Sequence, residues 1–458
     1  MSIVAPTRVL IRCDGAEVPG WLAGLPWTRS LDITSRGPTA DLNLRVEDLA
    51  GVLGAEVGDR ARDLVRIAAY AYQADRLVSR GGDRDADAAK WRRHLGLCVP
   101  VAAPEYWSAP VVTDRLVATL QFLTDDRWDV AFGPGKPEQR QLHLQRGARL
   151  LHREPGAVVL FSGGADSLGV LLEATLGGER PLAVGHWSAP PHEARQRALL
   201  DRLRERVSTW AFPPLGLRIH GVRTEPPERT QRTRAFLYAA LGAAVAAEVG
   251  VERVYLGDNG PVSLNLPISA QLVGALASRS THPKFLAGFN HLLEGMFPVA
   301  VRVENPLWTR IRAEGLAVLK DAGCADLLQE TLSCSRWSRL PGATPQCGTC
   351  SQCVDRRFAA ITAGLEAHDR PERYVRDVFL HDLPEGHDRT TAESYVRFAQ
   401  DVHGRSDEDL LTGYPQLVDG VLPEDPDAAG TLETLVDLLR RHARSTVRVL
   451  ETMTRREA

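Results

Sequence analysis

The chain has 458 residues, of which 44% are hydrophobic and 25% charged, and its formal net charge at pH 7 is −3. This composition is that of a globular protein with a sizeable core and two or three domains. The slightly acidic charge excludes a global basic field for nucleic acid. The N-terminus shows no apolar targeting segment, and the longest apolar run, residues 235–247, is too short to span a bilayer. We therefore expect a cytoplasmic protein with no membrane partner.

Residues 1–145 form the first predicted unit, an N-terminal α+β domain of unknown role. Apolar periodicity predicts six elements in it: strands at 8–14, 29–35, 40–49 and 92–101, and helices at 62–78 and 114–126. A polar, turn-rich segment at 132–141 marks the end of this unit.

From about residue 150 the pattern changes to strand, loop and helix in alternation. The predicted elements are strands at 157–161, 180–187, 215–222 and 251–257, and helices at 166–176, 192–207 and 233–250. Such alternation is typical of an α/β fold, a parallel sheet with helices on both faces, and we assign it to residues 150–330. A four-cysteine segment follows at 331–365, and then a mostly helical C-terminal extension at 366–458, with its clearest helix at 431–453.

The loop after the first strand of this second unit carries the strongest chemical signal, in the stretch VVLFSGGADSLGVLLEA at 158–174. Gly163 and Gly164 allow backbone N–H groups to face an anion, and the helix that follows adds its N-terminal N–H groups. The hydroxyls of Ser162 and Ser167 add donors, so the loop suits pyrophosphate. Asp166 fits an anion site if Mg²⁺ accompanies the phosphates or if it caps the helix. The loop is neither a Walker A nor a G-x-G-x-x-G motif.

A second signal is the cysteine pattern C-x12-C-x2-C-x2-C, formed by Cys334, Cys347, Cys350 and Cys353. In a chain without a signal peptide this spacing favours a metal over disulfides. Four thiolates make a closed, structural Zn²⁺ site, and an iron–sulfur cluster is the alternative. Cys324 lies ten residues upstream, and we expect it to be a buried thiol, although a fifth metal contact is the other interpretation.

The loop resembles the SGGxDS signature of the PP-loop ATP pyrophosphatases, which split ATP into AMP and pyrophosphate and adenylate a carboxylate or carbonyl oxygen. The resemblance implies ATP and Mg²⁺ as ligands and a PP-loop type of parallel sheet. It also places the adenine beside the end of the next strand, at His186. A packing or nucleotide-contact role for His186 is one interpretation, and a catalytic base is the other.

Together the loop and the cysteine pattern resemble the 7-cyano-7-deazaguanine synthase (QueC) family, over about residues 155–365. Members of that family bind zinc, adenylate 7-carboxy-7-deazaguanine and use ammonia to make an amide and then the nitrile preQ0. The stretch RTRAFLYAALGAA also resembles the family's R-N-x-x-F-L helix, with Arg232 and Phe236 aligned and Thr233 in the place of Asn.

One segment departs from that family. Where the synthases carry D-x-S-G-Y-P-D-C-R, this chain has GDNGPVSLNLPISAQLVGALASRSTHPKF at 257–285. This segment resembles the longer QueC-like proteins of anti-phage systems, such as QatC and the QueC-like component of type IV CBASS, which also carry an added N-terminal domain.

The residues of this segment suit a charged, planar ligand. Asp258 and Asn259 follow a strand end, where α/β sheets bind ligands, and a carboxylate can accept the guanidine-like edge of a deazaguanine. Arg279, His282 and Lys284 can hold phosphates or the substrate carboxylate. The plainer interpretations are a turn at Asn259 and a surface charge at Arg279.

The function expected from the resemblance is ATP-dependent adenylation of a 7-deazapurine carboxylate and transfer of the acyl group to an amine. The favoured acceptor is an amine of a partner protein encoded nearby, in an anti-phage defence system. The site residues implied are Ser162, Gly163, Gly164, Asp166, Ser167 and His186 for the nucleotide; Arg232, Asp258, Asn259 and His282 for the substrate; and Asp166, Arg279 and Lys284 for catalysis.

Three other functions remain open. The first is preQ0 synthesis from ammonia, which uses the same site without a partner. The second is a tRNA-modifying PP-loop enzyme, which the charge does not favour because such an enzyme needs a basic surface. The third is a nucleotide-binding scaffold that no longer turns over ATP.

Overall fold

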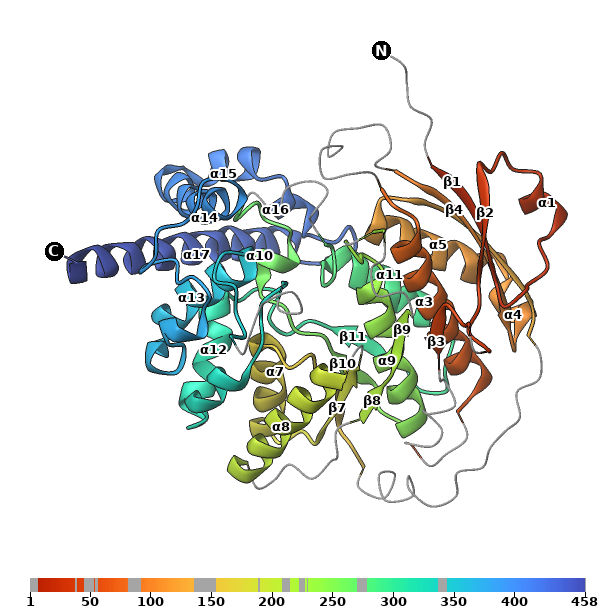
Figure 1. Cartoon of the computed structure of the whole chain (residues 1–458), viewed down its shortest axis with the longest axis horizontal. Coiled ribbons are helices and arrows are strands. Elements are labelled where there is room, and N and C mark those ends of the chain that lie inside the picture. Colours follow the sequence, from red (N-terminus) through yellow and green to blue (C-terminus); the bar gives the residue numbers. More distant parts are fainter. Residues whose placement is uncertain are drawn as a thin grey trace, which may run out of the picture.

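The computed structural model describes residues 7–37, 39–44, 53, 57–80, 92–135, 154–187, 190–207, 215–221, 227–228, 230–269, 278–336 and 344–457. Two sheets of parallel strands organise these residues, and one short antiparallel pair joins them. Figure 1 shows the two sheets with helices between them and a helical C-terminal region on the far side of the second sheet.

The first sheet has the order β2-β1-β4-β5. Its strands are β1 (Arg8–Cys13), β2 (Arg29–Ile33), β4 (His94–Val101) and β5 (Arg127–Pro134). Every neighbouring pair is parallel, so the predicted α+β character of this unit was wrong. The crossover helices α3 (Asp59–Leu77) and α5 (Pro110–Thr124) make it an α/β layer.

The second sheet has the order β11-β10-β6-β7-β8, and all its pairs are parallel, which confirms the predicted α/β arrangement. Its strands are β6 (Ala157–Leu160), β7 (Pro181–His186), β8 (Leu215–Leu217), β10 (Arg253–Tyr255) and β11 (Arg302–Glu304). The edge strand β11 was not predicted, because three residues carry too little periodicity.

The strand predicted at 215–222 is two strands separated at Arg218. β8 pairs with β7, whereas β9 (Ile219–Gly221) pairs antiparallel with β3 (Leu42–Leu44). The strand predicted at 40–49 is observed only as β3, and residues 45–49 lie outside the described residues. The chain therefore changes sheets within one apolar run and ties the first unit to the second.

The helices lie in layers that bury both faces of the second sheet (Figure 1). On one face lie α9 (Arg234–Val249) and α11 (Pro283–Leu293), which pack against α3 and α5 of the first unit; on the other lie α7 (Ala165–Leu176), α8 (Pro190–Arg206) and α12 (Arg312–Asp321). Alternate residues of β6 serve the two cores, since Val158 and Leu160 join α9 whereas Val159 joins α7. The run at 235–247 is thus confirmed as a buried helix.

The C-terminal region is helical, as predicted. It contains α14 (His387–Gly404), α15 (Asp407–Gly413), α16 (Gln416–Asp419) and α17 (Ala428–Glu457), and α13 (Ser351–Thr362) precedes it in the four-cysteine segment. Shorter helices elsewhere are α1 (Gly20–Ala23), α4 (Pro104–Trp107), α10 (Gly260–Ser263), η3 (Ala325–Glu330), η5 (Glu366–His368) and η6 (Pro371–Arg373). Within the described residues, no helix is both long enough and apolar enough to cross a membrane.

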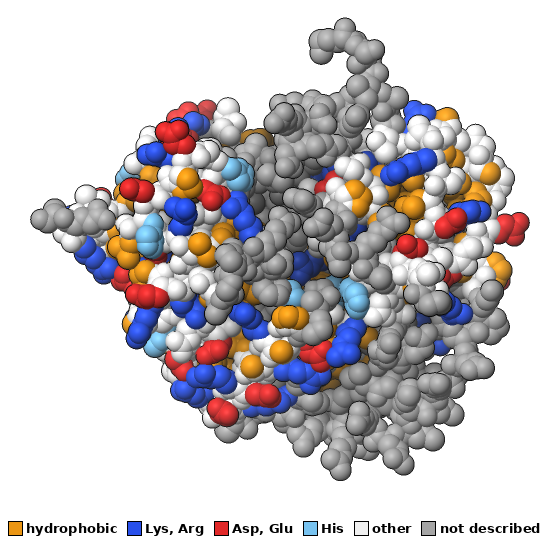
Figure 2. All heavy atoms as spheres, in the orientation of Figure 1, with side chains coloured by type: hydrophobic (Ala, Val, Ile, Leu, Met, Phe, Trp, Pro, Cys, Tyr) orange, Lys and Arg blue, Asp and Glu red, His pale blue; other side chains and the backbone are white. Residues whose placement is uncertain are grey.

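The surface shown in Figure 2 is consistent with the small net charge. Cationic and anionic side chains are interspersed over the C-terminal helices, and hydrophobic side chains gather over the first sheet. Trp21 on α1 is 57% exposed.

The first and second units share one core rather than meeting at a wet interface. Buried residues of β1, α3 and α5 form a single cluster with those of α9 and α11. The predicted boundary at 132–141 falls mostly outside the described residues, and the division into domains stays a prediction.

A buried ion-pair network crosses this shared core at Asp75 of α3. Its carboxylate lies 2.5 Å from Arg93 and 3.4 Å from Arg80, and it accepts the backbone N–H of Thr233 at 3.1 Å, just before α9. Burial alone would raise the pKa of Asp75, but Arg93 and Arg80 lower it to about 2.

We predict that Asp75→Asn lowers the free energy of unfolding by about 3–5 kcal/mol at pH 7, because the buried guanidinium groups of Arg93 and Arg80 then share a single carboxylate, that of Asp126. The pKa is depressed, so the stabilisation is complete above about pH 4, where the unfolded chain is ionised. It is lost as the pH falls toward 2. Urea unfolding of both proteins from pH 7 to pH 2 measures the difference.

The control is Asp59→Asn on the same helix, whose carboxylate is exposed and pairs with Arg62. It is expected to change the free energy of unfolding by no more than about 0.5 kcal/mol. Equal effects of the two variants would contradict the prediction.

Candidate phosphate loop and metal centre

The loop between β6 and α7 has the backbone that an anion site requires. Gly163 has φ = +80°, a left-handed conformation, and a Cβ there would lie 3.2 Å from the Gln196 side chain. Gly164 is the N-cap of α7, and no side chain caps the helix there. The first backbone N–H groups of α7 are therefore available to an anion bound in the loop.

The two loop serines converge, as the sequence predicted. Their hydroxyl oxygens are 3.2 Å apart; Ser167 donates to the Gly164 carbonyl at 3.1 Å, and the Gly164 N–H donates to Ser162 Oγ at 3.3 Å. The loop backbone is held from outside as well, because Gln196 donates to the Ser162 carbonyl at 3.1 Å and the Leu332 N–H donates to the Gly163 carbonyl at 3.0 Å.

Asp166 does not cap the helix, which removes one of its two predicted roles. Its oxygens accept from Nε and Nη2 of Arg312 at 3.3 and 2.9 Å, and the residue is only 8% exposed. Each carboxylate oxygen keeps a lone pair beyond this hydrogen bond, so the donor set still fits Mg²⁺. However, the ion pair already compensates the charge that would attract the cation.

Arg312, at the start of α12, is the centre of a buried cluster. Beyond Asp166, it contacts Asp355 at 2.9 Å and the Gln352 side-chain oxygen at 2.7 Å, both on α13. Turning the Asn259 amide by 180° places its oxygen 3.2 Å from Nε and Nη2 of Arg312, the orientation that these donors require. Asn259 thus joins the cluster from the end of β10.

Asp258 also lies at this edge of the sheet, as predicted, because β6 and β10 are parallel neighbours. One of its carboxylate oxygens accepts from Thr281 Oγ at 3.3 Å. The Asn305 side chain donates to its carbonyl at 2.8 Å and accepts its N–H at 3.3 Å. The segment at Asn259 is the start of α10 rather than a simple turn.

The electrostatics of Asp258 are unusual for an aspartate. Burial and the nearby Asp166 carboxylate raise the pKa of Asp258 to about 7, against the opposing effects of Arg312 and the Thr281 hydroxyl. Near neutral pH this carboxyl group is therefore divided between a charged acceptor and a neutral donor.

Two of the predicted cations lie apart from the phosphate loop, at the end of α5. Arg279 donates to the Phe122 carbonyl at 2.6 Å and pairs with Asp125 at 2.9 Å. Arg232 pairs with the other oxygen of Asp125 at 3.3 Å. Burial and Arg80 lower the pKa of Arg232 to about 10. Arg279 is thus an interface ion pair rather than an isolated surface charge.

Lys284 and His282 occupy the beginning of α11. Lys284 pairs with Asp419 of α16 at 2.9 Å. His282 accepts the Lys284 N–H at its Nδ1, and its ring lies 5.1 Å from that of Phe122. Burial, followed by Arg279 and Lys284, lowers the pKa of His282 to about 4. These side chains link the first unit, α11 and the C-terminal region, and Thr281 connects their segment to Asp258.

His186 has the surroundings of a packing residue. Its Nε2 is hydrogen-bonded to the Ile219 carbonyl, and its ring contacts Tyr72 and Tyr238 edge-on. Burial, followed by Arg234, lowers the pKa of His186 to about 3, so the neutral ring joins β7 to β9.

The four predicted cysteines come together in a buried cluster. Their sulfur atoms lie within 4.8 Å of one another, and those of Cys347 and Cys353 are 3.8 Å apart. Tetrahedral Zn²⁺ with Zn–S bonds of about 2.3 Å needs sulfur atoms about 3.8 Å apart, so the donor set fits zinc. Backbone N–H groups point at the sulfurs of Cys334 and Cys347. Cys324 lies instead in the second core and donates to the Ala322 carbonyl.

The position after the second of these cysteines, Gly348, requires a glycine. It has φ = +84°, and a Cβ there would lie 1.6 Å from the Arg376 carbonyl oxygen. The tight approach allows the cysteine loop to pair with the segment before α14.

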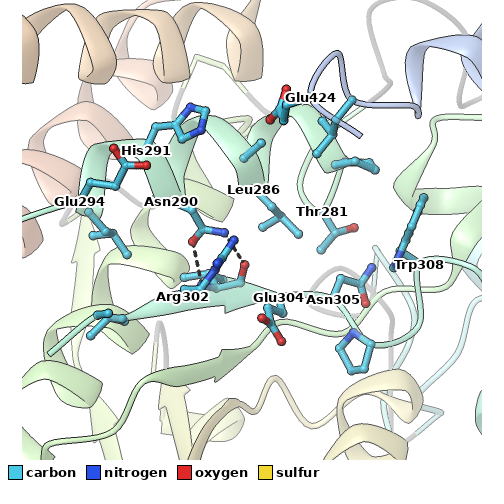
Figure 3. Close-up of a pocket in the computed structure, with 18 of the residues that line it drawn as sticks. Thr281, Leu286, Asn290, His291, Glu294, Arg302, Glu304, Asn305, Trp308 and Glu424 are labelled. Atoms are coloured by element: carbon cyan, nitrogen blue, oxygen red, sulfur yellow. Dashed lines mark hydrogen bonds between the residues drawn. The ribbon is translucent and has the colours of Figure 1, made fainter. Parts of the chain in front are cut away.

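A cleft of about 880 Å³ opens beside Asp258, between α11 and β11. Figure 3 shows Thr281, Asn305 and Trp308 at one end of it, and Asn290 bonded to the backbone of the edge strand. Because Thr281 and Asn305 also contact Asp258, the cleft shares a wall with the candidate substrate residues.

Sequence reasoning missed Arg312, Gln352, Asp355 and Leu332. Asp355 carried one usable signal, since it follows Cys353 by two residues and precedes two arginines in a helical pattern. Arg312 lies in no recognisable motif, and its importance depends on what the fold places around it.

No protein-family model matches the chain, and no curated protein matches it significantly. The described residues therefore define an α/β protein with two parallel sheets and a buried four-cysteine cluster that could bind zinc. Any closer assignment rests on the loop, the cysteine spacing and the site geometry.

We predict that the purified chain binds one Zn²⁺ ion and that Cys350→Ser abolishes this binding, because three thiolates do not close the site. Metal analysis and cobalt substitution, followed by absorption, measure it. Cys324→Ser replaces an equally buried thiol outside the cluster and is expected to retain full metal content. An iron signal, or equal metal loss in both variants, would overturn the assignment.

We also predict that Asp258 makes stability depend on pH. The folded chain holds its proton up to about pH 7, whereas the unfolded chain releases it near pH 4. The free energy of unfolding therefore falls as the pH rises between these values. Asp258→Asn should flatten this part of the curve in urea unfolding experiments. Parallel curves for the two proteins would show that the pKa is not raised.

Proposed function

We propose that the chain is a QueC-like PP-loop ATP pyrophosphatase. In this proposal it adenylates the carboxylate of a 7-deazapurine of the 7-carboxy-7-deazaguanine type and transfers the acyl group to an amine. The favoured acceptor is an amine of a partner protein encoded nearby, in an anti-phage defence system. The observation that carries the proposal is the uncapped α7 N-terminus behind a left-handed Gly163, with Asp258 at the same sheet edge.

The loop residues would hold the phosphates of ATP. Gly163, Gly164 and the first turn of α7 offer N–H groups, and Ser162 and Ser167 offer hydroxyls, to the oxygens that become pyrophosphate. Mg²⁺, when bound, would neutralise charge on those oxygens, and Asp166 would hold it through the lone pairs that its ion pair with Arg312 leaves. Zn²⁺ at the four cysteines would have a structural role, because a closed site leaves no open position.

The chemistry has two steps. A substrate carboxylate oxygen attacks the α-phosphorus, so that an acyl–oxygen–phosphorus bond forms while the bond to pyrophosphate breaks. The neutral amine then attacks the acyl carbon, AMP leaves with the oxygen, and the amine loses one proton. In its ionised form, the carboxylate of Asp258 at the end of β10 would accept hydrogen bonds from the N–H edge of the base.

Three other predicted site residues are already engaged in ion pairs. Arg279, Lys284 and Arg232 already have carboxylate partners in Asp125 and Asp419. A catalytic or substrate role for them would need these pairs to open when the substrate binds. The loop and Asp258 support the proposal without them.

The nature of the acceptor is supported by the cleft beside Asp258. A volume of about 880 Å³ far exceeds that of an ammonia molecule and would admit a peptide segment. Ammonia, as in preQ0 synthesis, remains the second candidate because it needs the same activated carboxylate.

The test is to incubate the full chain with ATP, Mg²⁺ and 7-carboxy-7-deazaguanine, with and without ammonia and with the neighbouring gene products. Intact-mass spectrometry follows both the base and the proteins. We predict that a partner protein gains the mass of the base minus water. Asp166→Ala should abolish this gain, whereas Glu173→Gln, an acidic residue two turns further along α7, should retain it.

An amide or nitrile base that forms only with ammonia would replace the conjugation hypothesis with a synthase. The absence of AMP from the wild-type reaction would contradict the deazapurine assignment, and RNA would be the next substrate to test.

A further inference from the structure

We infer that the four-cysteine site positions the phosphate loop, and that Arg312 and the backbone N–H of Leu332 are the groups through which it does so. The inference concerns geometry within this chain, and it rests on the proposed function only for the identity of the loop's ligand, a nucleotide phosphate. Two separate connections join the cysteine cluster to the loop.

The first connection is through the backbone before Cys334. Leu332 packs against the cysteine cluster, and its N–H donates to the Gly163 carbonyl at 3.0 Å. Its own carbonyl lies 3.5 Å from where a Cβ on Gly164 would be. A metal bound to Cys334 would therefore also fix the position of Leu332, whose N–H is bonded to the glycine turn.

The second connection is through α13, whose N-cap is Cys350 and whose first turn holds Cys353. Gln352 lies between these two cysteines and contacts Arg312 through its side chain at 2.7 Å and its carbonyl at 3.2 Å. Asp355, one turn on, pairs with Arg312 at 2.9 Å. Arg312 then holds both oxygens of Asp166.

Burial makes this second connection stiff. Arg312 is 4% exposed, and Tyr395 of α14 holds the other oxygen of Asp355 at 2.9 Å. Separating one member of such a network from the others leaves a buried charge without a partner, which is energetically costly. A displacement of α13 is therefore expected to displace Arg312 and Asp166 with it. A metal that ties Cys334 to Cys347, Cys350 and Cys353 would set the first turn of α13 and, through it, Asp166.

The experiment uses the full chain in four forms: wild type, Arg312→Gln, Arg312→Lys and Arg310→Gln. Arg310 is the matched control because it pairs with Glu173 on the same helix α7, at 2.9 Å through both oxygens, and within the described residues its side chain has no bond to the cysteine segment. Each form is measured loaded with zinc and after chelation. The readouts are ATP affinity by calorimetry, amide hydrogen exchange at residues 158–168, and the melting temperature.

In the wild type, chelation is expected to weaken ATP binding about tenfold and to speed exchange at residues 162–167. Arg312→Gln should weaken ATP binding by a similar factor while zinc stays bound, and chelation should then add little. Arg312→Lys should restore part of the affinity, and Arg310→Gln should behave as the wild type does. This non-additive pattern separates positioning through Arg312 from a general loss of stability.

Unchanged ATP affinity and unchanged exchange after chelation of the wild type would overturn the inference. Equal, additive losses in Arg312→Gln and Arg310→Gln would do the same. If zinc-loaded wild type binds no ATP, the proposed function fails, and exchange at 162–167 still decides the inference. If Arg312→Gln does not fold, Gln352→Ala, which removes one bond to Arg312 and no charge, should show a smaller version of the same pattern.

Discussion

The ion pair between Arg312 and Asp166 is the interaction on which the arrangement of the candidate site depends. A guanidinium that is almost fully buried needs carboxylates and hydrogen-bond acceptors on every side. Here they come from the phosphate loop, the end of β10 and the first turns of α13. Segments that are distant in sequence are therefore held to one geometry by the requirement to satisfy a single buried cation.

The first unit and the C-terminal region contribute to the site in different ways. The C-terminal region reaches it through Tyr395, which donates a hydrogen bond to Asp355, the partner of Arg312 on α13. The first unit contributes indirectly, because it shares a core with α9 and α11. In addition, its Asp125 pairs with Arg232 and Arg279. The helix α11, which lies between the two sheets, also forms one wall of the cleft beside β11.

Much of the fold could be predicted because its signals are local. Period-two and helical apolar patterns located most of the described strands and the helices α3, α5, α7, α8, α9 and α17, but they missed β5 and the helices α11 to α15. Strand–helix alternation implied parallel pairing in the second unit. The same reasoning failed for the first unit, because apolar alternation does not reveal whether neighbouring strands run parallel. It failed again at 215–222, where one apolar run serves two sheets and the change occurs at Arg218, a residue with no turn signal.

The sequence by itself determined the glycine turn of the candidate phosphate loop and three of the four clustered cysteines, because these depend on local backbone geometry. Gly163 needs no neighbour to adopt a positive φ, and C-x2-C spacing keeps Cys347, Cys350 and Cys353 close together. Cys334 is joined to them by the fold. Only the tertiary structure decided which charges surround the loop. Arg312 lies in no motif of the sequence, yet it pairs with Asp166 of the loop. Arg279 and Lys284, which were predicted as site residues because of their charge, pair instead with Asp125 and Asp419. The physical reason is that the strength of an ion pair depends on the distance between the two charges and on their burial. The fold determines both quantities, and the local spacing of residues determines neither.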